Sequence, residues 1–549
     1  MISSNVIVIG VNSKYSHSNL ALRYFRENCG CDIFECSIND NIFNVYSALC
    51  ERDYKVFCFS VYIWNVEFTL KLVPMLKNAR RDIKIIFGGP EAGYNYTELL
   101  SKYNFIDGII IGEGEYAITE IINGSSNDQI PNYVYRNGNK IICNEVKKVD
   151  LRKIKFPYNK VDVTELKNKI VYFETSRGCL FNCSYCLSSS EGRTRYFDME
   201  YVKNGIKFFI DNSVPLVKFI DRTFNENNER ACEILNFIVQ NNKQTKFHFE
   251  VSPILLTEEF KKILRKANGL VQLEMGIQTT NIDTMKCINR VYDVKKVKEK
   301  LNLIPSGVHV HLDLIAGLPM ETLESFKDGF NYVYSLHPDM LQLGFLKLLH
   351  NTNLKKDAEK YQIKTTSFPP YEVLSTSTMH AKDLILLKKV ENAVDKYYNS
   401  GAFHNSLLIL TGWSYLPSFL ISPCWLRNDP FETFEKIGVE LYQREKEGPL
   451  SRPALYELLY EIYGDDIKWG LARDFVINNP NLKVPDILLS ENDKNANLNN
   501  YRKKILEYDD YKNTKFRLVA AGGEIFIISG KDKVESYDHS FRLRHKEIL

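Results

Sequence analysis

One loop of the chain carries three cysteines in the spacing C-x3-C-x2-C: Cys179, Cys183 and Cys186. The loop follows an apolar, β-branched run at 169–173, so the three thiols are expected together at the carboxyl end of a strand. Three thiolates bind three irons of a four-iron, four-sulfur cluster and leave the fourth iron open to a substrate. A closed zinc site would need a fourth ligand, and the loop offers none. The loop therefore predicts a [4Fe-4S] cluster.

Strand and helix patterns alternate after this loop. Further strands are predicted at 216–220, 246–251, 270–274, 308–313 and 340–344, and most of them precede an amphipathic helical pattern. With the cysteine-bearing strand they make six βα units, a partial version of the parallel barrel whose active face lies at the carboxyl ends of its strands.

Polar residues and glycines recur at or after these predicted strand ends, where they would surround the cluster. Any single one of them has a simpler explanation, such as capping the helix that begins near Glu226. Their repetition around one cysteine loop favours a binding site instead. The predicted binding residues of this region are Asp221, Thr223, Glu250, Glu274, Gly276, Gln278, Gly317 and Pro319.

The N-terminal third alternates short apolar strands with amphipathic helices, a pattern typical of a doubly wound parallel sheet. Ligands bind such sheets at the carboxyl ends of the strands, and glycines there let the backbone approach a large, flat guest. Glycine also closes tight turns, so that explanation stays open. The predicted ligand-side residues are Ser60, Tyr62, Trp64, Asn65, Gly88, Gly89, Pro90, Gly112 and Gly114.

Charge and hydropathy limit the partners of the protein. Lys and Arg number 71 and Asp and Glu number 68, a net charge of +3, so no general attraction to nucleic acid is expected. No run of eighteen apolar residues and no N-terminal leader pattern appears, which predicts a cytoplasmic protein without a membrane partner. Five N-terminal cysteines could hold a second cluster, but their place in apolar stretches favours small buried side chains: Cys29, Cys31, Cys36, Cys50 and Cys58.

The segment from Arg177 to Cys186 resembles the cluster loop of the radical S-adenosylmethionine superfamily, and residues 1–355 are similar to its cobalamin-binding branch. The resemblance implies that the three cysteines hold the cluster and that its open iron chelates S-adenosylmethionine. It implies that Tyr185 lies against the adenine. It also implies that 276–278 and 317–319 line the adenosine site, and that 221–225 lies near the methionine amino group.

The sequence departs from this branch on the side of cobalamin. Glu91 stands in Gly-Gly-Pro-Glu-Ala where many relatives carry histidine, and His17 lacks the D-x-H-x-x-G context of a cobalt-ligating histidine. The lower face of a cobalamin would then be lined by Tyr62, Trp64 or Asn65. Core packing of the two aromatic residues is the competing explanation.

The predicted fold class is α/β, with four segments. Residues 1–145 form a Rossmann-like cobalamin-binding domain, 146–168 a solvated linker, and 169–355 a partial (β/α)6 TIM-type radical enzyme barrel. Residues 356–549 form a mainly helical domain that ends in a β-hairpin, and parts of it resemble an uncharacterised extension of cobalamin-type radical enzymes.

The resemblance implies a cobalamin-dependent radical S-adenosylmethionine enzyme that works without oxygen and most simply methylates an unactivated carbon of a small molecule or peptide. Its cofactors would be the [4Fe-4S] cluster, S-adenosylmethionine and cobalamin, and its electron donor a protein such as flavodoxin or ferredoxin. Two alternatives remain open at this point. One is a tRNA methylthiotransferase-type enzyme with a second cluster, and the other is a non-catalytic corrinoid or iron-sulfur sensor or electron carrier.

Overall fold

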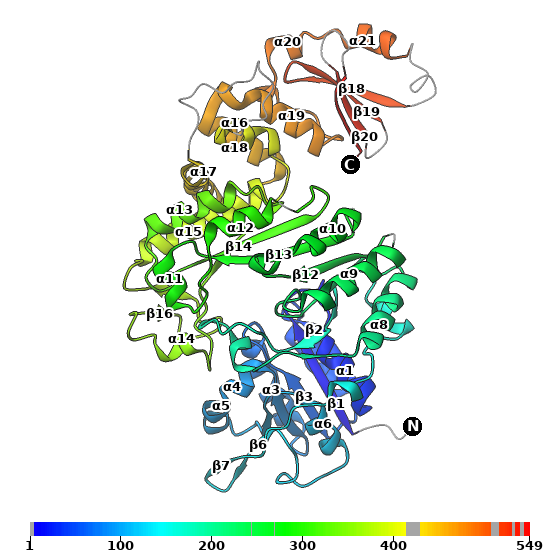
Figure 1. Cartoon of the computed structure of the whole chain (residues 1–549), viewed down its shortest axis with the longest axis vertical. Coiled ribbons are helices and arrows are strands. Elements are labelled where there is room, and N and C mark those ends of the chain that lie inside the picture. The colour runs from blue at the N-terminus through cyan, green and yellow to red at the C-terminus, as the bar shows by residue number, and fades with distance from the viewer. Residues whose placement is uncertain are drawn as a thin grey trace. The chain divides into compact units, whose positions relative to one another are not determined.

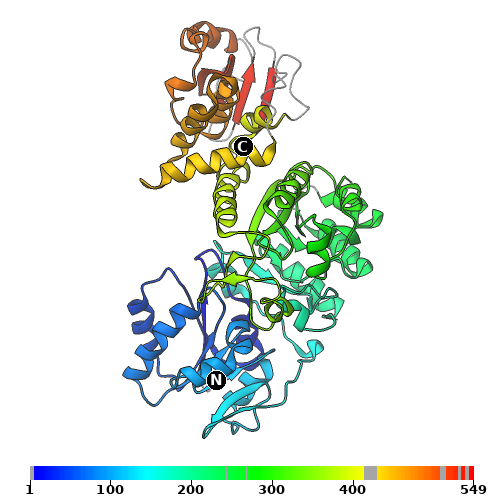
Figure 2. The ribbon, with the colours of Figure 1, turned by 90° about the vertical axis from the view of Figure 1, so that its left-hand side faces the viewer.

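The computed structural model describes residues 5–242, 244–267, 269–302, 304–412, 429–506, 515–529, 533–537 and 543–548. The chain forms two compact units (Figures 1 and 2). The first contains Met1–Glu321 and Gly344–Met379, and the second contains Thr322–Leu343 and His380–Leu549. Among the described residues, no helix combines the length and the apolar character needed to cross a membrane.

The first unit begins with a seven-stranded sheet of order β2-β1-β3-β4-β5-β6-β7. The first five strands in sequence are parallel, and β6 and β7 extend the sheet as an antiparallel edge. The strands are β1 (Val6–Asn12), β2 (Asp32–Ser37), β3 (Val56–Ser60), β4 (Lys84–Gly88), β5 (Gly108–Ile110), β6 (Tyr133–Asn137) and β7 (Lys140–Cys143).

Helices cover both faces of this sheet because the strands are apolar on both sides. Along β1, Ile7 and Ile9 join one apolar core, whereas Val6 and Val8 join another on the opposite face. The first core receives α2 (Ile42–Cys50), α3 (Val66–Ala79), α4 (Pro90–Tyr94) and α5 (Tyr96–Lys102), and the second receives α1 (Leu20–Cys29) and α6 (Glu115–Ile122). The predicted doubly wound domain is confirmed.

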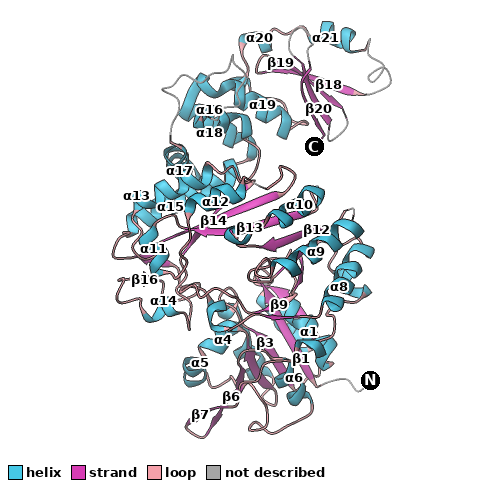
Figure 3. Ribbon diagram, in the orientation of Figure 1, coloured by secondary structure: helices cyan, strands magenta, loops and turns pink. Residues whose placement is uncertain are grey.

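The predicted partial barrel is also confirmed. A second sheet has the order β15-β14-β13-β12-β11-β8, and its strands from β8 to β14 pair in parallel (Figure 3). Buried and half-buried residues alternate along β13, so one face packs on helices and the other faces the lumen. The strands are β8 (Val171–Phe173), β11 (Leu216–Phe219), β12 (Lys246–Glu250), β13 (Val271–Gln278), β14 (His309–Ala316) and β15 (Met340–Phe345), with helices α8 (Met199–Asp211), α9 (Asn228–Asn241), α10 (Glu258–Ala267), α11 (Ile282–Cys287) and α12 (Val294–Leu301) between them.

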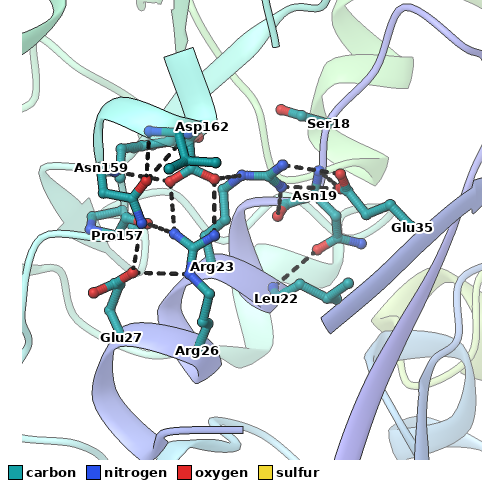
Figure 4. A network of polar contacts seen from close by, with 12 residues as sticks. Ser18, Asn19, Leu22, Arg23, Arg26, Glu27, Glu35, Pro157, Asn159 and Asp162 are labelled. Carbon is teal, nitrogen blue, oxygen red and sulfur yellow. Dashed lines mark hydrogen bonds and ion pairs between the residues drawn. The ribbon is translucent and has the colours of Figure 1, made fainter. Parts of the chain in front are cut away.

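The segment at 146–168 has exposed basic side chains and a smaller set of buried residues that anchor it to the protein. It contains α7 (Lys160–Glu165), whose Asp162 is buried and accepts from Arg26 Nη2 at 2.6 Å. Arg23 Nε lies 3.3 Å from the same carboxylate and Arg23 Nη2 lies 3.0 Å from Glu35 Oε2 (Figure 4). Two arginines of α1 thus bind this segment to the first domain, a pairing that its basic composition did not indicate.

The second unit is helical and ends in a sheet. Phe330 of α13 packs edge-on against Phe431 of α17, and a four-stranded antiparallel sheet closes the described chain. The predicted hairpin is β18 with β19, and the further strands β20 and β21 lie beyond the two that were expected. The elements are α13 (Leu323–Tyr334), α15 (Ala381–Ala393), α16 (His404–Thr411), α17 (Pro430–Glu445), α18 (Arg452–Tyr463), α19 (Lys468–Asn478), β18 (Phe516–Ala521), β19 (Glu524–Ser529), β20 (Lys533–Tyr537) and β21 (Leu543–Ile548).

Candidate cofactor site

The cysteine loop leaves the carboxyl end of β8 and is held at its base by a short hairpin. Strand β9 (Ser176–Arg177) pairs antiparallel with β10 (Arg195–Tyr196), which follows the loop. Gly178 has φ +105°, and a Cβ there would lie 2.8 Å from the carbonyl oxygen of Arg193. Only glycine fits this close approach, so Gly178 lets the backbone before Cys179 lie against the strand that follows the loop.

The three thiols suit a cluster better than a single ion. Cys183 is buried, Cys179 and Cys186 are half-buried, and all three are free. Within the described ranges, no group of three ligand atoms that lie within 4.8 Å of one another includes these sulfurs. A tetrahedral ion would need them about 4 Å apart. Burial raises the pKa of the Cys179 thiol, and the adjacent thiols Cys186 and Cys183 raise it further.

Asp221 holds the strand end that leads into the loop. Its carboxylate is buried and accepts hydrogen bonds from Thr175 Oγ1 and Ser176 Oγ, both at 2.6 Å, and from Thr175 N at 3.0 Å. Both carboxylate oxygens of this predicted binding residue therefore accept hydrogen bonds from the protein itself. Thr223 Oγ1 lies 3.5 Å from Cys179 Sγ, and its contact with S-adenosylmethionine stays a prediction.

Arg290 is a site residue that the sequence did not reveal. Its Nη1 lies 3.5 Å from Cys183 Sγ, and its Nη2 donates to the Gly276 carbonyl oxygen at 2.7 Å. A guanidinium in this position supplies positive charge beside a cluster thiolate. Tyr185 lies in the same environment, where burial raises the pKa of its hydroxyl and Arg290 opposes the rise.

The lumen below the loop is strongly polar. Glu274 Oε2 accepts from Lys218 Nζ and lies beside His248 Nε2, both at 2.9 Å. Burial acts to raise the pKa of Glu274, but His248 and Lys218 outweigh it and hold the pKa at about 2. Burial raises the pKa of Glu250, and the nearby Glu274 adds to the rise. Burial and then Glu274 and Glu250 raise the pKa of Asp313 to about 8.

Two buried polar atoms of neighbouring strands have no hydrogen-bond partner: Asp313 Oδ1, within β14, and Gln278 Oε1, at the end of β13. Gln278 has φ +69° and follows a bulge, and a Cβ on Gly276 would collide with its side chain at 1.9 Å. Gly317 has φ +81° and begins the turn that contains Pro319. Buried polar groups without partners are uncommon and indicate a missing ligand, so this rim fits a polar cofactor such as S-adenosylmethionine.

The predicted ligand-side residues after β3 include a buried residue that stabilises the loops and an exposed residue that could contact a ligand. Asn65 is buried and donates to the carbonyl oxygens of Val11 (2.8 Å) and Ser60 (2.9 Å), so it ties two loops together. Trp64 is 44% exposed and stacks on Tyr62, with ring centroids 4.2 Å apart and planes 9° apart. The stacked pair offers an apolar platform at the ligand end of the sheet.

The glycines at the other strand ends serve close contacts. Gly89 has φ +88°, and a Cβ there would lie 2.6 Å from the Val61 carbonyl oxygen, so the turn from Gly88 to Pro90 lies directly against the loop after β3. Gly112 has φ +66°, and a Cβ on Gly114 would lie 2.9 Å from the Phe25 ring. These contacts are the turn and packing roles that the sequence analysis left open.

Glu91 is joined by two residues from beyond the barrel strands that the sequence did not associate with it. Tyr371 donates from its hydroxyl to Glu91 Oε1 at 2.5 Å, and His350 Nε2 lies 3.7 Å from the same oxygen. Burial raises the pKa of Glu91, and Tyr371 and then His350 oppose the rise. His17 is engaged elsewhere, since its Nδ1 lies 2.7 Å from the Tyr172 hydroxyl.

The cysteine loop and the glycine-rich end of the first sheet are fixed to each other. Arg177 Nη2 donates to Glu115 Oε1 at 2.7 Å and to Glu174 Oε1 at 2.8 Å. Arg195, from the other strand of the hairpin, pairs with Glu113. Glu113 and Glu115 flank Gly114 and follow Gly112. The predicted cluster end and one predicted cobalamin-side strand end are therefore adjacent in the first unit.

Comparison with known proteins agrees with this arrangement. The Radical SAM superfamily model matches residues 173–333, the B12 binding domain model matches 6–122, and a model described as a protein of unknown function (DUF4080) matches 359–523.

The cobalamin-dependent radical SAM methyltransferase TokK of Streptomyces tokunonensis is 24% identical over 341 residues, which are 56% of this chain and 50% of TokK. The 2-(S-pantetheinyl)-carbapenam-3-carboxylate methyltransferase of Streptantibioticus cattleyicolor is 23% identical over 304 residues, 50% of this chain and 44% of the relative. This chain thus spans about half the length of these curated relatives.

A solved structure shows the same fold. The radical S-adenosylmethionine methyltransferase TsrM of Kitasatospora setae, with cobalamin and a [4Fe-4S] cluster bound, superposes with a TM-score of 0.57 at 15% identity. The match covers 67% of this chain and 80% of TsrM.

A partial parallel barrel with a three-cysteine loop at its strand ends follows a doubly wound sheet in this chain. The chain therefore combines a radical SAM domain at 173–333 with a B12 binding domain at 6–122. The cofactors that these domains imply are a [4Fe-4S] cluster, S-adenosylmethionine and cobalamin. The residues fit them through the three-thiol donor set, the unpartnered Gln278 and Asp313 atoms, and the stacked rings of Tyr62 and the exposed Trp64.

Proposed function

We propose that this enzyme transfers a methyl group to an unactivated carbon of a small molecule or peptide. The observation that carries the proposal is the pairing of Arg177 with Glu115 and of Arg195 with Glu113, which keeps the cluster loop next to the cobalamin-side sheet end. Bound S-adenosylmethionine and methylcobalamin would supply a 5′-deoxyadenosyl radical and a methyl group at this junction. The similarity to two methyltransferases supports the same reaction.

The chain's own residues have distinct proposed roles. Cys179, Cys183 and Cys186 hold the cluster, Asp221 positions the loop, and Arg290 places positive charge beside it. Gln278 and Asp313 present polar atoms to S-adenosylmethionine. The remaining proposed lining residues of the two cofactors are Tyr185, Thr223, Glu250, Glu274, Gly276, Gly317 and Pro319 on the barrel side, and Ser60, Tyr62, Trp64, Asn65, Gly88, Gly89, Pro90, Gly112 and Gly114 on the other.

The alternative with a second cluster is less well supported. Among the five N-terminal cysteines, Cys31 and Cys58 lie in the apolar core on one face of the sheet, whereas Cys36 and Cys50 pack on the other face. Burial raises the pKa of Cys31 and of Cys36 to about 12, which favours the thiol over the metal-binding thiolate.

We propose a cytoplasmic enzyme with a flavodoxin or ferredoxin donor. We also propose the four segment boundaries predicted from the sequence.

The test uses the full chain reconstituted without oxygen and supplied with hydroxocobalamin, a strong reductant and S-adenosylmethionine that carries a deuterated methyl group. The expected products are 5′-deoxyadenosine and cobalamin that carries the deuterated methyl group, both detected by mass spectrometry. Cys183→Ala should form neither, whereas Cys143→Ala, at an exposed cysteine, should match the natural protein. Eight irons per chain would support the methylthiotransferase type instead, and cobalamin that stays free on desalting would overturn the proposal.

A further inference from the structure

A second group of metal-binding side chains lies in the barrel lumen, apart from the cysteine loop. His248 of β12, Glu274 of β13 and His311 of β14 each offer one ligand atom, and these atoms all lie within 4.8 Å of one another. In the part of the chain that the structure describes, no other group of three histidines, cysteines or acidic residues is as close. We propose that these three residues bind a divalent transition-metal ion such as Zn²⁺. The inference goes beyond the proposed methyl transfer and does not depend on it.

The barrel backbone places the three side chains. They come from adjacent parallel strands. Glu274 pairs directly with His311, whereas His248 pairs with Gln272, two residues before Glu274 and on the same face of β13. All three point to the lumen because residues alternate between the helix-facing and lumen-facing sides of a strand. Since each ligand comes from a paired central strand, the separation of the ligands is set by the sheet and not by a loop.

The donor set suits a first-row transition metal. Two imidazoles with one carboxylate are a known ligand combination for zinc and for non-haem iron, and three protein ligands leave positions open toward the lumen. His248 Nδ1 lies 3.5 Å from Gln272 Oε1, the kind of second contact that orients a metal-ligating histidine. His248 Nε2 faces Glu274 Oε2 at 2.9 Å, and this contact is attractive only when a proton or a cation lies between the two atoms.

Lys218 is the group that opposes a cation here, because its Nζ lies 2.9 Å from Glu274 Oε2. Lys218 and His248 both contact Oε2 of Glu274. The other carboxylate oxygen, Oε1, is not bonded to either of them. An ion bound through Oε1 leaves the lysine contact in place. The Glu250 and Asp313 carboxyl groups also lie near Glu274, which adds to the rise that burial causes in the pKa of each.

The first experiment is Zn²⁺ titration of the cluster-loaded full chain, followed by metal analysis, since the loop thiols are then already occupied by iron. We expect one Zn²⁺ per chain in addition to the cluster. His311→Gln and Glu274→Gln should each weaken binding at least about tenfold. His309→Gln, at a lumen histidine outside the group on the same strand, should bind as the natural protein does, and circular dichroism should show that all variants are folded.

The second experiment uses Co²⁺ with the variant that has alanine at all three loop cysteines. Visible Co²⁺ bands without a thiolate charge-transfer band are expected, and His311→Gln in this background should abolish them. The proposal is overturned if the natural chain binds no Zn²⁺, if His311→Gln and Glu274→Gln bind as tightly as His309→Gln, or if the Co²⁺ spectrum reports sulfur ligation.

Discussion

Tyr371 donates a 2.5 Å hydrogen bond to Glu91 across 280 residues of sequence, and so joins the segment after the barrel strands to the end of β4 in the first domain. Glu91 is only 5% exposed, and the other polar group near it, His350 Nε2, is 3.7 Å away. The Tyr371 hydroxyl is therefore the main partner of a buried carboxylate.

Tyr371→Phe should loosen α4. The phenyl ring retains the edge-on contact with His350, but Glu91 loses its hydroxyl donor, which costs roughly 1 to 3 kcal/mol for a buried polar group. Hydrogen–deuterium exchange at α4 measures the local opening free energy. Tyr94→Phe is the matched control because it removes an exposed hydroxyl contact to Ser190 and should change little. Equal exchange in the two variants would contradict the role given to Tyr371.

Arg290→Met should lower the reduction potential of the cluster. Loss of a positive charge 3.5 Å from Cys183 Sγ disfavours the reduced, more negative cluster, by on the order of tens of millivolts. Redox titration followed by electron paramagnetic resonance measures the midpoint. Arg290→Lys should restore part of the lost potential. Arg193→Met, at an exposed arginine of the segment between Cys186 and β10, should leave the midpoint unchanged. The prediction fails if both methionine variants shift the potential equally.

Trp64→Ala should weaken cobalamin binding. The indole is exposed and stacked on Tyr62, and loss of one aromatic contact with a flat ligand is worth about tenfold in affinity. The affinity can be measured by hydroxocobalamin absorbance after equilibrium dialysis. Trp64→Phe should keep most of the affinity, because the stacked surface remains while the hydrogen bond to the Val11 carbonyl oxygen is lost. Phe43→Ala, at another exposed aromatic of this domain, is the control, and an equal loss there would refute the platform.

Local patterns predicted the elements and the cysteine site because both depend on short stretches of sequence. Apolar runs identified the parallel strands of the two sheets but not the antiparallel β6 and β7, and the spacing of Cys179 to Cys186 predicted the cluster loop. The strand predicted at 270–274 was too short, since β13 continues to Gln278 and Glu274 lies within it on the lumen side. The last two strands, β20 and β21, were missed because Lys533–Tyr537 and Leu543–Ile548 are mostly polar and lack a clear apolar face.

Contacts between distant segments could not be predicted in this way. Arg290 reaches Cys183 across 107 residues, and nothing in its own neighbourhood distinguishes it from a surface arginine. The hydrogen bonds from Thr175 and Ser176 to the Asp221 carboxylate were not predicted either, because a strand-end position does not reveal which partner is nearest. The ion pairs that anchor the segment at 146–168 were not predicted for the same reason, since Arg23 and Arg26 lie in a different domain.

Glu321 gives the first unit a dependence on pH that its substitution should remove. Burial raises its pKa from 4.5 to about 8, although the hydrogen bond from Thr279 Oγ1 at 2.5 Å opposes the rise. Between these values the folded chain retains a proton that the unfolded chain releases, so the free energy of unfolding falls as pH rises through this window. Glu321→Gln stays neutral and can still accept from Thr279, so its midpoint of urea unfolding should match the natural chain near pH 5. At pH 8 it should be more stable, on the order of 3 kcal/mol. Glu324→Gln, at an exposed carboxylate, should leave the dependence of unfolding free energy on pH unchanged. If Glu321→Gln shows the same dependence as the natural chain, Glu321 is ionised in the folded protein and the prediction is wrong.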